Sequence, residues 1–278
     1  MIAGDQVVSY AVVGNPVTHS LSPRIHASFA EQTGQALSYS AIEIPLDDFA
    51  AGIRSLQNQG FGGVNVTVPF KREAWELCDN LSARAEQAGA ANTLSFMPDG
   101  SIAGDNTDGI GLLRDLLENL KLEVSRREVL VLGAGGAVRG VLGPLLEQSP
   151  AGLTLANRSP DKAIALARDF GNQGNIQAVS FDALGAREFD LVINGTAAGL
   201  GNEVPDIPES IVADHTVCYD MMYDLKAATA FVDWARSCGA ARAVDGLGML
   251  VEQAAEAFNI WRGVRPSTAR VIDSLRQA

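Results

Sequence analysis

The segment Gly62–Lys71 (GGVNVTVPFK) combines a strand pattern with side chains that can do chemistry. Three valines alternate with Asn65 and Thr67, so we expect the valines to face a core and the amide and hydroxyl to lie on the opposite face. Strands of a parallel sheet that are buried on both faces are nearly continuously apolar. The polar face is therefore expected to meet a ligand or another domain. A proline and a phenylalanine should end the strand, so that Lys71 starts a helix.

Two later motifs add polar side chains that could join this face. GAANTL supplies Asn92, and GDNTDG supplies Asp108 beside further amide and hydroxyl groups. Such a cluster at strand ends suits a polyhydroxylated ligand, because each hydroxyl needs a donor or an acceptor. GDNTDG alone is also typical of a turn with a helix cap, and it lacks the spacing of a calcium loop. For Lys71, the alternative is a lysine that covers the surface end of a strand.

The segment GNPVTHSLSPRIHASF places two hydroxyls at the start of an expected helix. Ser20 and Ser22, with the free N–H groups there, would make an anion site suited to a carboxylate. The alternative, which the motif alone favours, is that Ser22 only caps the helix as its N-cap residue. We interpret His19 and His26 as structural, because no third metal-ligand type stands at a suitable spacing.

A hydrophobic strand at 127–132 leads directly into a glycine-rich loop and then a helix. Glycines let the backbone turn tightly and let a pyrophosphate approach the helix N-terminus, where free N–H groups and the helix dipole favour anions. GxG alone is a weak signal, and an ordinary strand–helix turn is the alternative, but the strand–loop–helix order favours a dinucleotide. The loop residues are Gly133, Ala134, Gly135, Gly136 and Ala137.

The residues at the end of the next strand indicate which dinucleotide, NAD or NADP, the protein binds. An acidic residue there would bind the ribose 2′-hydroxyl of NAD, but this chain has Asn157, Arg158 and Ser159, with Lys162 in the first turn of the following helix. Two cations and a hydroxyl would hold a 2′-phosphate by charge-assisted hydrogen bonds. Solvated side chains at a helix start are the alternative, although the helix dipole disfavours cations there unless an anion lies between. We therefore expect NADP.

Composition excludes several other classes of protein. The net charge of 278 residues is 21 − 33 = −12, which disfavours binding to nucleic acid or to an anionic membrane. Cys78, Cys218 and Cys238 are odd in number and far apart, so neither a disulfide framework nor a zinc site is expected. The first 16 residues lack the charged region of a signal peptide, and no apolar run approaches the roughly 18–20 residues of a membrane span. A cytoplasmic protein is expected.

Strands and helices alternate through two successive series, which predicts an α/β fold with parallel strands. Between the strands at 92–97 and 101–106, Pro98-Asp99-Gly100 predicts a turn. Expected strands lie at 7–13, 39–44, 62–69, 92–97, 101–106 and 127–132, and within 152–157, 189–200, 216–224 and 241–249. Expected helices lie at 23–33, 46–60, 72–78, 82–89, 109–120, 137–148, 160–170, 226–239, 250–263 and 266–278. The helix at 46–60 is expected to carry acidic residues in its first turn.

The motifs taken together resemble those of the shikimate dehydrogenases, in the same order and over nearly the whole chain. They are GNPVTHSLSPRIHASF, GVNVTVPFK, GAANTL, GDNTDG, GAGGA, NRS, YDMMY and DGLGMLVEQAAEAFNIW. The resemblance implies NADP-dependent reduction of 3-dehydroshikimate to shikimate, a step of aromatic amino acid (chorismate) biosynthesis. It also implies an N-terminal α/β substrate domain, a Rossmann domain with a doubly wound parallel sheet, and a cleft between them. We expect residues 1–108, completed by 247–278, to form the first domain and 109–246 the second.

The resemblance also assigns roles to individual residues. Lys71 and Asp108 would be the catalytic pair, in which the lysine ammonium polarises the ketone oxygen and donates its proton in the reducing direction. Ser20 and Ser22 would hold the shikimate carboxylate, with Tyr223 near it. The ring hydroxyls would be bound by Asn65, Thr67, Asn92 and Gln253, and Asp108 would bind the substrate as well. Residues Gly133 to Ala137 would bind the pyrophosphate, Asn157 to Lys162 the 2′-phosphate, and Met221 and Gly246 would lie near the nicotinamide.

Two positions depart from the family pattern: Val138 in the glycine loop, and NGTAAG at 194–199, where a Thr-Ser pair is more usual. A quinate/shikimate dehydrogenase that uses NAD is the nearest alternative, opposed by Arg158 and Lys162. A non-catalytic ligand sensor on the same fold is another, opposed by the presence of Lys71 and Asp108. The expected partners are the small-molecule substrate and NADP, without nucleic acid or membrane, in a monomer or homodimer.

Overall fold

In the computed structural model, residues 7–201 and 203–277 are described. The expectation that residues 1–16 are not a signal peptide falls partly outside this description, since residues 1–6 are not included. The strands are β1 Val8–Gly14, β2 Leu37–Glu43, β3 Gly63–Val66, β4 Asn80–Leu81, β5 Thr93–Phe96, β6 Ile102–Asp105, β7 Glu128–Leu132, β8 Gly152–Asn157, β9 Ile176–Ser180, β10 Leu191–Asn194, β11 Val217–Asp220 and β12 Arg242–Val244.

The α-helices are α1 Ser22–Thr33, α2 Phe49–Asn58, α3 Lys71–Leu77, α4 Ala83–Ala88, α5 Asp108–Arg114, α6 Gly136–Glu147, α7 Pro160–Phe170, α8 Ala230–Ser237, α9 Leu247–Arg262 and α10 Ala269–Arg276. A π-helical turn, η1, extends α5 over Asp115–Asn119. Short 3₁₀ turns follow at η2 Phe181–Ala183, η3 Ala197–Gly201 and η4 Glu209–Ile211. In the described residues, no helix is long and apolar enough to cross a membrane.

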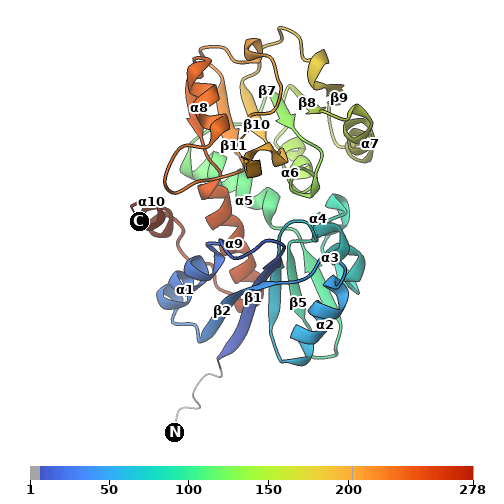
Figure 1. The fold of residues 1–278 in the computed structure, drawn as a ribbon, viewed down its shortest axis with the longest axis vertical. Helices are drawn as coiled ribbons and strands as arrows, with labels where there is room; N and C mark the ends of the chain where they lie inside the picture. Colours follow the sequence, from blue (N-terminus) through green and yellow to red (C-terminus); the bar gives the residue numbers. More distant parts are fainter. Residues whose placement is uncertain (1–6, 202, 278) are drawn as a thin grey trace. The chain divides into compact units, whose positions relative to one another are not determined.

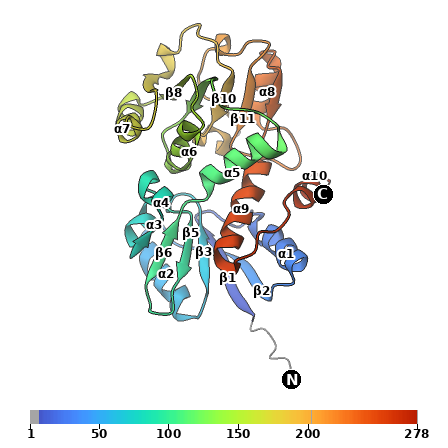
Figure 2. The same cartoon turned by 180° about the vertical axis from the view of Figure 1, so that it is seen from behind.

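The chain forms two compact units, each built on one six-stranded sheet. The first unit comprises the chain up to Gly111 together with Val251–Ser274, and the second comprises Leu112–Leu250 and the chain from Leu275. Figures 1 and 2 show the two units from opposite sides. The α/β architecture expected from the alternation of strand and helix patterns is confirmed.

The sheet of the first unit has the order β2-β1-β3-β5-β6-β4. β5 runs antiparallel to both of its neighbours, whereas the other pairings are parallel. The expectation of parallel strands is therefore wrong at β5, because the tight turn at Asp99 and Gly100 returns the chain directly as β6. Strands joined by so short a connection must pair antiparallel, since a parallel pair needs a crossover of a dozen or more residues.

Helices α2 and α3 cover one face of this sheet, where Ile53 and Ala74 pack on Val64 and Val66. The opposite face is covered by α1 and by the part of α9 beyond Val251, whose aromatic rings stack on the strands. The Tyr10 and Trp261 rings lie 4.6 Å apart. This packing explains why a segment from the end of the chain completes the first unit.

The sheet of the second unit has the order β12-β11-β10-β7-β8-β9, and all of its pairings are parallel. Numbered within the sheet, this is the 3-2-1-4-5-6 strand order of the Rossmann fold. One core, with residues of α6 and α7, covers one face, and a second core around Phe231 of α8 covers the other. The strand order reverses at β7, between β8 and β10, which is where such sheets bind ligands.

Candidate active site

Lys71 and Asp108 form an ion pair in the first unit. Lys71 Nζ lies 2.6 Å from Asp108 Oδ2, and the two side chains are 14% and 6% exposed. Lys71 begins α3 and Asp108 begins α5, and the strands that precede these helices, β3 and β6, end at the same edge of the sheet. An ammonium held against a carboxylate, with limited access to water, is equipped to give and take a proton.

Asn92 and Gln253 adjoin this pair. Asn92 Nδ2 donates to Asp108 Oδ1 at 2.9 Å, and it lies 3.4 Å from Gln253 Oε1. The Thr107 hydroxyl lies 3.2 Å from the same Gln253 oxygen. The structure therefore brings together four of the predicted site residues, from α3, α5, α9 and the residue just before β5.

Asn65 and Thr67 lie at the end of β3. Asn65 is 6% exposed, and its Nδ2 donates to the Asn92 carbonyl at 3.2 Å, so it joins the same cluster. Thr67 follows the strand, and its N–H donates to the Val13 carbonyl at 2.9 Å. The third valine of the pattern, Val68, does not reach the core as expected but is 45% exposed, because the strand ends at Val66.

Ser22 is the first residue of α1, and Ser20 lies in the loop two residues before it. The expected N-cap role of Ser22 is wrong: the helix begins at Ser22 itself, and the Ser20 hydroxyl accepts from the Ser22 N–H at 3.2 Å. Ser22 is 5% exposed. The acids expected in the first turn of α2 likewise precede that helix, with Asp48 at its N-cap.

His26 lies one turn further along α1 and packs flat on Tyr39, with ring centroids 4.0 Å apart. Burial lowers the pKa of His26 to about 3, against a smaller raising effect of Asn65. Burial also raises the pKa of Tyr39, an effect that the Ser22 hydroxyl opposes. Both rings are therefore uncharged at neutral pH, and they link α1 to the Asn65 end of the cluster.

The glycine loop of the second unit follows β7. Gly133 has a φ of 106°, which L side chains rarely adopt, and a Cβ there would lie 2.9 Å from the Gly195 carbonyl oxygen. A Cβ on Gly135, the residue before α6, would meet open space. A left-handed turn, an open approach and a twelve-residue helix starting at Gly136 fit a pyrophosphate.

Asn157 is the last residue of β8, the strand next to β7, and residues 158–162 follow it. The Gly133 N–H donates to the Ala156 carbonyl at 2.8 Å. Asn157 Nδ2 donates to the Ser159 carbonyl at 2.9 Å, which shapes this turn. Arg158, Ser159 and Lys162 are exposed. Two exposed cations beside the glycine loop fit a 2′-phosphate.

Met221 and Gly246 follow β11 and β12 on the other side of the glycine loop. A Cβ on Gly246 would lie 2.5 Å from the Met221 carbonyl oxygen, and one on Gly195 would lie 2.9 Å from the Met221 sulfur. Gly133 also lies close to Gly195. The glycine loop, Met221 and Gly246 therefore lie together at the end of the sheet where β7, β10, β11 and β12 finish. Tyr223 lies in the loop after β11 and is half-buried.

A buried network that the sequence did not reveal supports this edge. The fully buried Asp220 accepts from Asn194 Nδ2 at 3.0 Å, from the Met222 N–H at 3.1 Å and from the Thr229 hydroxyl at 2.6 Å. Burial raises the pKa of Asp220, and these donors oppose the shift. The network joins the ends of β10 and β11 to the start of α8.

Comparisons with known proteins assign the family. Residues 12–94 match the shikimate dehydrogenase substrate binding domain, 115–202 the shikimate/quinate 5-dehydrogenase family and 246–276 the shikimate 5′-dehydrogenase C-terminal domain. The shikimate dehydrogenase (NADP(+)) of Methylobacillus flagellatus is 56% identical over 97% of this chain and 99% of its own. The chain belongs to the shikimate dehydrogenase family.

Solved structures agree with this assignment. The Aquifex aeolicus shikimate dehydrogenase is 34% identical with a TM-score of 0.86, and each chain is covered completely. The Thermus thermophilus shikimate 5-dehydrogenase, solved in complex with NADP(H) and shikimate, is 34% identical with a TM-score of 0.85 over 98% of this chain and 99% of its own. The fold consists of the family's N-terminal substrate-binding domain and a Rossmann domain.

The structure explains how this chain accommodates Val138, which departs from the family's glycine loop. Val138 is fully buried on α6, and its Cγ2 lies 2.5 Å from where a Cβ on Gly195 would be. A small residue at the helix normally allows this close approach. Here Gly195, in the other segment that departs from the pattern, provides the space.

Gly195→Ala should therefore destabilise the protein by roughly 1–3 kcal/mol through overpacking. Adding Val138→Ala should recover part of the loss, with a coupling of roughly 0.5–3 kcal/mol in a double-mutant cycle of denaturant unfolding. Strictly additive effects of the two substitutions would show that the side chain at 138 does not set the space at 195.

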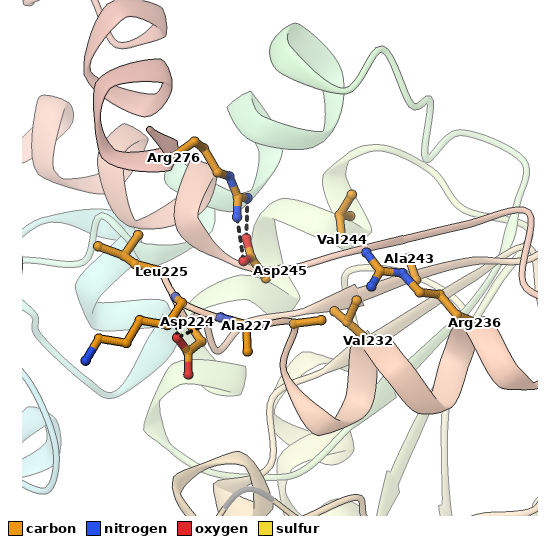
Figure 3. Close-up of a pocket in the computed structure, with 11 residues that line it drawn as sticks. Asp224, Leu225, Ala227, Val232, Arg236, Ala243, Val244, Asp245 and Arg276 are labelled. Atoms are coloured by element: carbon orange, nitrogen blue, oxygen red, sulfur yellow. Dashed lines mark hydrogen bonds and ion pairs between the residues drawn. The ribbon is translucent and has the colours of Figure 1, made fainter. Parts of the chain in front are cut away.

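A surface pocket of about 360 Å³ lies elsewhere on the second unit, between α8, β12 and the 224–228 loop. Figure 3 shows the Arg276 guanidinium directed at the Asp245 carboxylate, and Arg276 Nη1 donates to Asp245 Oδ2 at 2.7 Å. Asp245 also accepts from the Leu247 N–H at 3.2 Å and so caps the start of α9. The pocket contains none of the predicted site residues, and its ion pair fixes the turn that carries Gly246.

Proposed function

We propose that this protein catalyses the NADP-dependent interconversion of 3-dehydroshikimate and shikimate, in the reducing direction for aromatic amino acid biosynthesis. The observation that carries the proposal is the Lys71–Asp108 ion pair, 2.6 Å apart, to which the Asn92 amide donates a hydrogen bond. An acid–base pair in a polar, largely buried cluster suits oxidation of a secondary alcohol in a polyhydroxylated ring. Relatives over 50% identical bear the name shikimate dehydrogenase (NADP(+)).

The residues of the first unit manage the substrate and one proton. NADP, when bound, supplies the hydride or takes it up. In the reducing direction the Lys71 ammonium polarises the ketone oxygen and donates a proton to it. In the oxidising direction the neutral amine takes that proton from the hydroxyl, and Asp108 stabilises the ammonium that forms. The ion-pair distance of 2.6 Å is short enough for this stabilisation to be strong.

The other site residues receive binding roles in the same proposal. Ser20 and Ser22 hold the substrate carboxylate, and Tyr223 contributes to substrate binding. The ring hydroxyls are bound by Asn65, Thr67, Asn92 and Gln253. The cofactor is held by Gly133, Ala134, Gly135, Gly136 and Ala137 at its pyrophosphate, by Asn157, Arg158, Ser159 and Lys162 at its 2′-phosphate, and by Met221 and Gly246 near its nicotinamide.

We also propose that residues 1–108 with 247–278 form the substrate-binding and catalytic domain, and that 109–246 form the NADP-binding domain. These bounds lie within four residues of the two compact units, except at the end of α10, where the chain from Leu275 groups with the second unit. A cytoplasmic monomer or homodimer, with no membrane or nucleic-acid partner, completes the proposal.

The direct test is to incubate the purified protein with NADPH and 3-dehydroshikimate. NADPH should be consumed in equal amount to the shikimate formed, as identified by mass spectrometry. A protein that binds both compounds but transfers no hydride would instead be a ligand sensor on the same fold.

A further inference from the structure

Tyr39 of β2 and Thr93 of β5 connect two proposed substrate-binding amides to the catalytic carboxylate. The Tyr39 hydroxyl donates to Asn65 Oδ1 at 2.8 Å, and Asn65 Nδ2 donates to Thr93 Oγ1 at 3.0 Å. The Thr93 hydroxyl donates to Asn92 Oδ1 at 2.9 Å, and Asn92 Nδ2 donates to Asp108 Oδ1 at 2.9 Å. The four hydrogen bonds all point in one direction, from the tyrosine to the aspartate.

Backbone groups determine this direction. Asn65 Nδ2 also donates to the Asn92 carbonyl, which can only accept, and Asn92 Oδ1 also accepts from the Thr107 N–H at 2.8 Å, which can only donate. Neither amide can be flipped without breaking such a bond. Because the Thr93 hydroxyl accepts from Asn65, its single proton is available for Asn92.

The sheet holds the two ends of this chain of hydrogen bonds in register. Asn65 and Thr93 are directly opposite each other in the antiparallel pair of β3 and β5. Thr93 is 1% exposed and Asn92 2% exposed, so water has little access to compete for their bonds. In such surroundings successive hydrogen bonds strengthen one another.

We propose that Tyr39 and Thr93 are positioning residues for the catalytic pair. Beside the backbone bonds that orient the two amides, these hydroxyls donate to the amide oxygens and hold the amides in place. An N–H is thereby kept against one oxygen of Asp108, which leaves the other oxygen to Lys71. This role rests on the proposed function, because it assumes that the pair exchanges a proton with the substrate. Losing the chain should make the Asp108 carboxylate a stronger base.

The charged groups around the pair are few among the described residues. From β6, Asp105 is bound by Arg84 of α4, which also binds Glu256 of α9 at 3.1 Å. Lys71 itself comes from α3, and His26 near Asn65 is neutral. The proposed substitutions change none of these charges, so a shift in titration would report the hydrogen-bond chain.

The test compares Thr93→Val, which removes the hydroxyl at nearly constant shape, with Thr93→Ser, which keeps it. The carbon-13 signal of the Asp108 side-chain carboxyl, assigned with Asp108→Asn, is followed against pH without substrate. Thr93→Val should raise the titration midpoint of the Asp108 carboxyl signal by about 0.5–1 pH unit. The acidic limb of the kcat profile for shikimate oxidation should likewise move to higher pH. Thr93→Ser should behave as the unsubstituted protein, and Tyr39→Phe should shift both readouts in the same direction by less.

Thr154→Val is the matched control, because Thr154 is a buried strand threonine of the second unit whose hydroxyl accepts from Gln177 at 2.9 Å. It should leave both readouts unchanged. An unchanged Asp108 midpoint in Thr93→Val, or an equal shift in Thr93→Ser, would overturn the positioning role. If Thr93→Val fails to fold, Tyr39→Phe decides in the same way. Failure of the unsubstituted protein to oxidise shikimate would refute the proposed function, whereas the carboxyl titration would still decide this inference.

Discussion

Lys71→Ala should lower the turnover number for shikimate oxidation by roughly 10²–10⁴-fold, the usual range for an acid–base group. The substitution removes the group that accepts the hydroxyl proton but leaves Asn92 and Gln253, which are proposed to bind the ring. Shikimate affinity, measured by calorimetry, should therefore change far less than turnover. A loss in kcat that exceeds the loss in binding is the signature of an interaction made mainly in the transition state.

Arg72→Ala is the control for this experiment. Arg72 is the next residue of α3, but its side chain is 63% exposed. It pairs on the helix surface with Glu76, 2.9 Å away, and lies 5.3 Å from the centroid of the Trp75 ring. Exposed pairs of this kind contribute little to stability, so the variant should retain near-normal turnover. Near-normal turnover in Lys71→Ala would instead remove the lysine from the chemistry.

Replacing both Arg158 and Lys162 with alanine should lower the preference for NADP over NAD by roughly 10²-fold in kcat/KM, about tenfold for each charge-assisted bond lost. NAD has no 2′-phosphate, so its own kcat/KM should hardly change. Steady-state kinetics with each cofactor at saturating shikimate measure the ratio. The effect should weaken as salt concentration rises, because both side chains are exposed.

Arg168→Ala provides the matched control. Arg168 is an exposed cation in the last turn of the same helix, α7, and the change alters net charge and helix composition without touching the proposed phosphate site. It should leave the cofactor preference as it was. An unaltered preference in the Arg158/Lys162 double variant would mean that specificity for NADP arises elsewhere on the second unit.

The sequence predicted those parts of the site that are governed by local patterns. Asn65 and Thr67 stood out because they interrupt an apolar alternation, and the glycine loop stood out because it follows a strand and starts a helix. Lys71 does begin a helix, as the proline before it indicated. The roles of Tyr223 and Gln253 came only from the family resemblance, since nothing in their spacing indicates what they bind.

The rest depends on contacts between segments distant in sequence. Thr93 meets Asn65 through the antiparallel register of β3 and β5, whereas the alternation of strand and helix patterns predicts parallel strands there. The edge strand β9 was missed because its residues are mostly half-buried and show no strong alternation. At Val68 the sequence predicts too long a strand, because the alternation of valines continues to Val68 whereas β3 ends at Val66.

The most direct test of the account is the kcat/KM of the unsubstituted protein with shikimate and with quinate, each paired with NADP⁺ and with NAD⁺. We predict that shikimate with NADP⁺ gives the highest value of the four. Replacing NADP⁺ with NAD⁺, which lacks the 2′-phosphate, should lower the kcat/KM for shikimate by roughly 10²-fold. Higher values with quinate or with NAD⁺, or no cofactor reduction with any pair, would contradict the proposed NADP-dependent shikimate dehydrogenase.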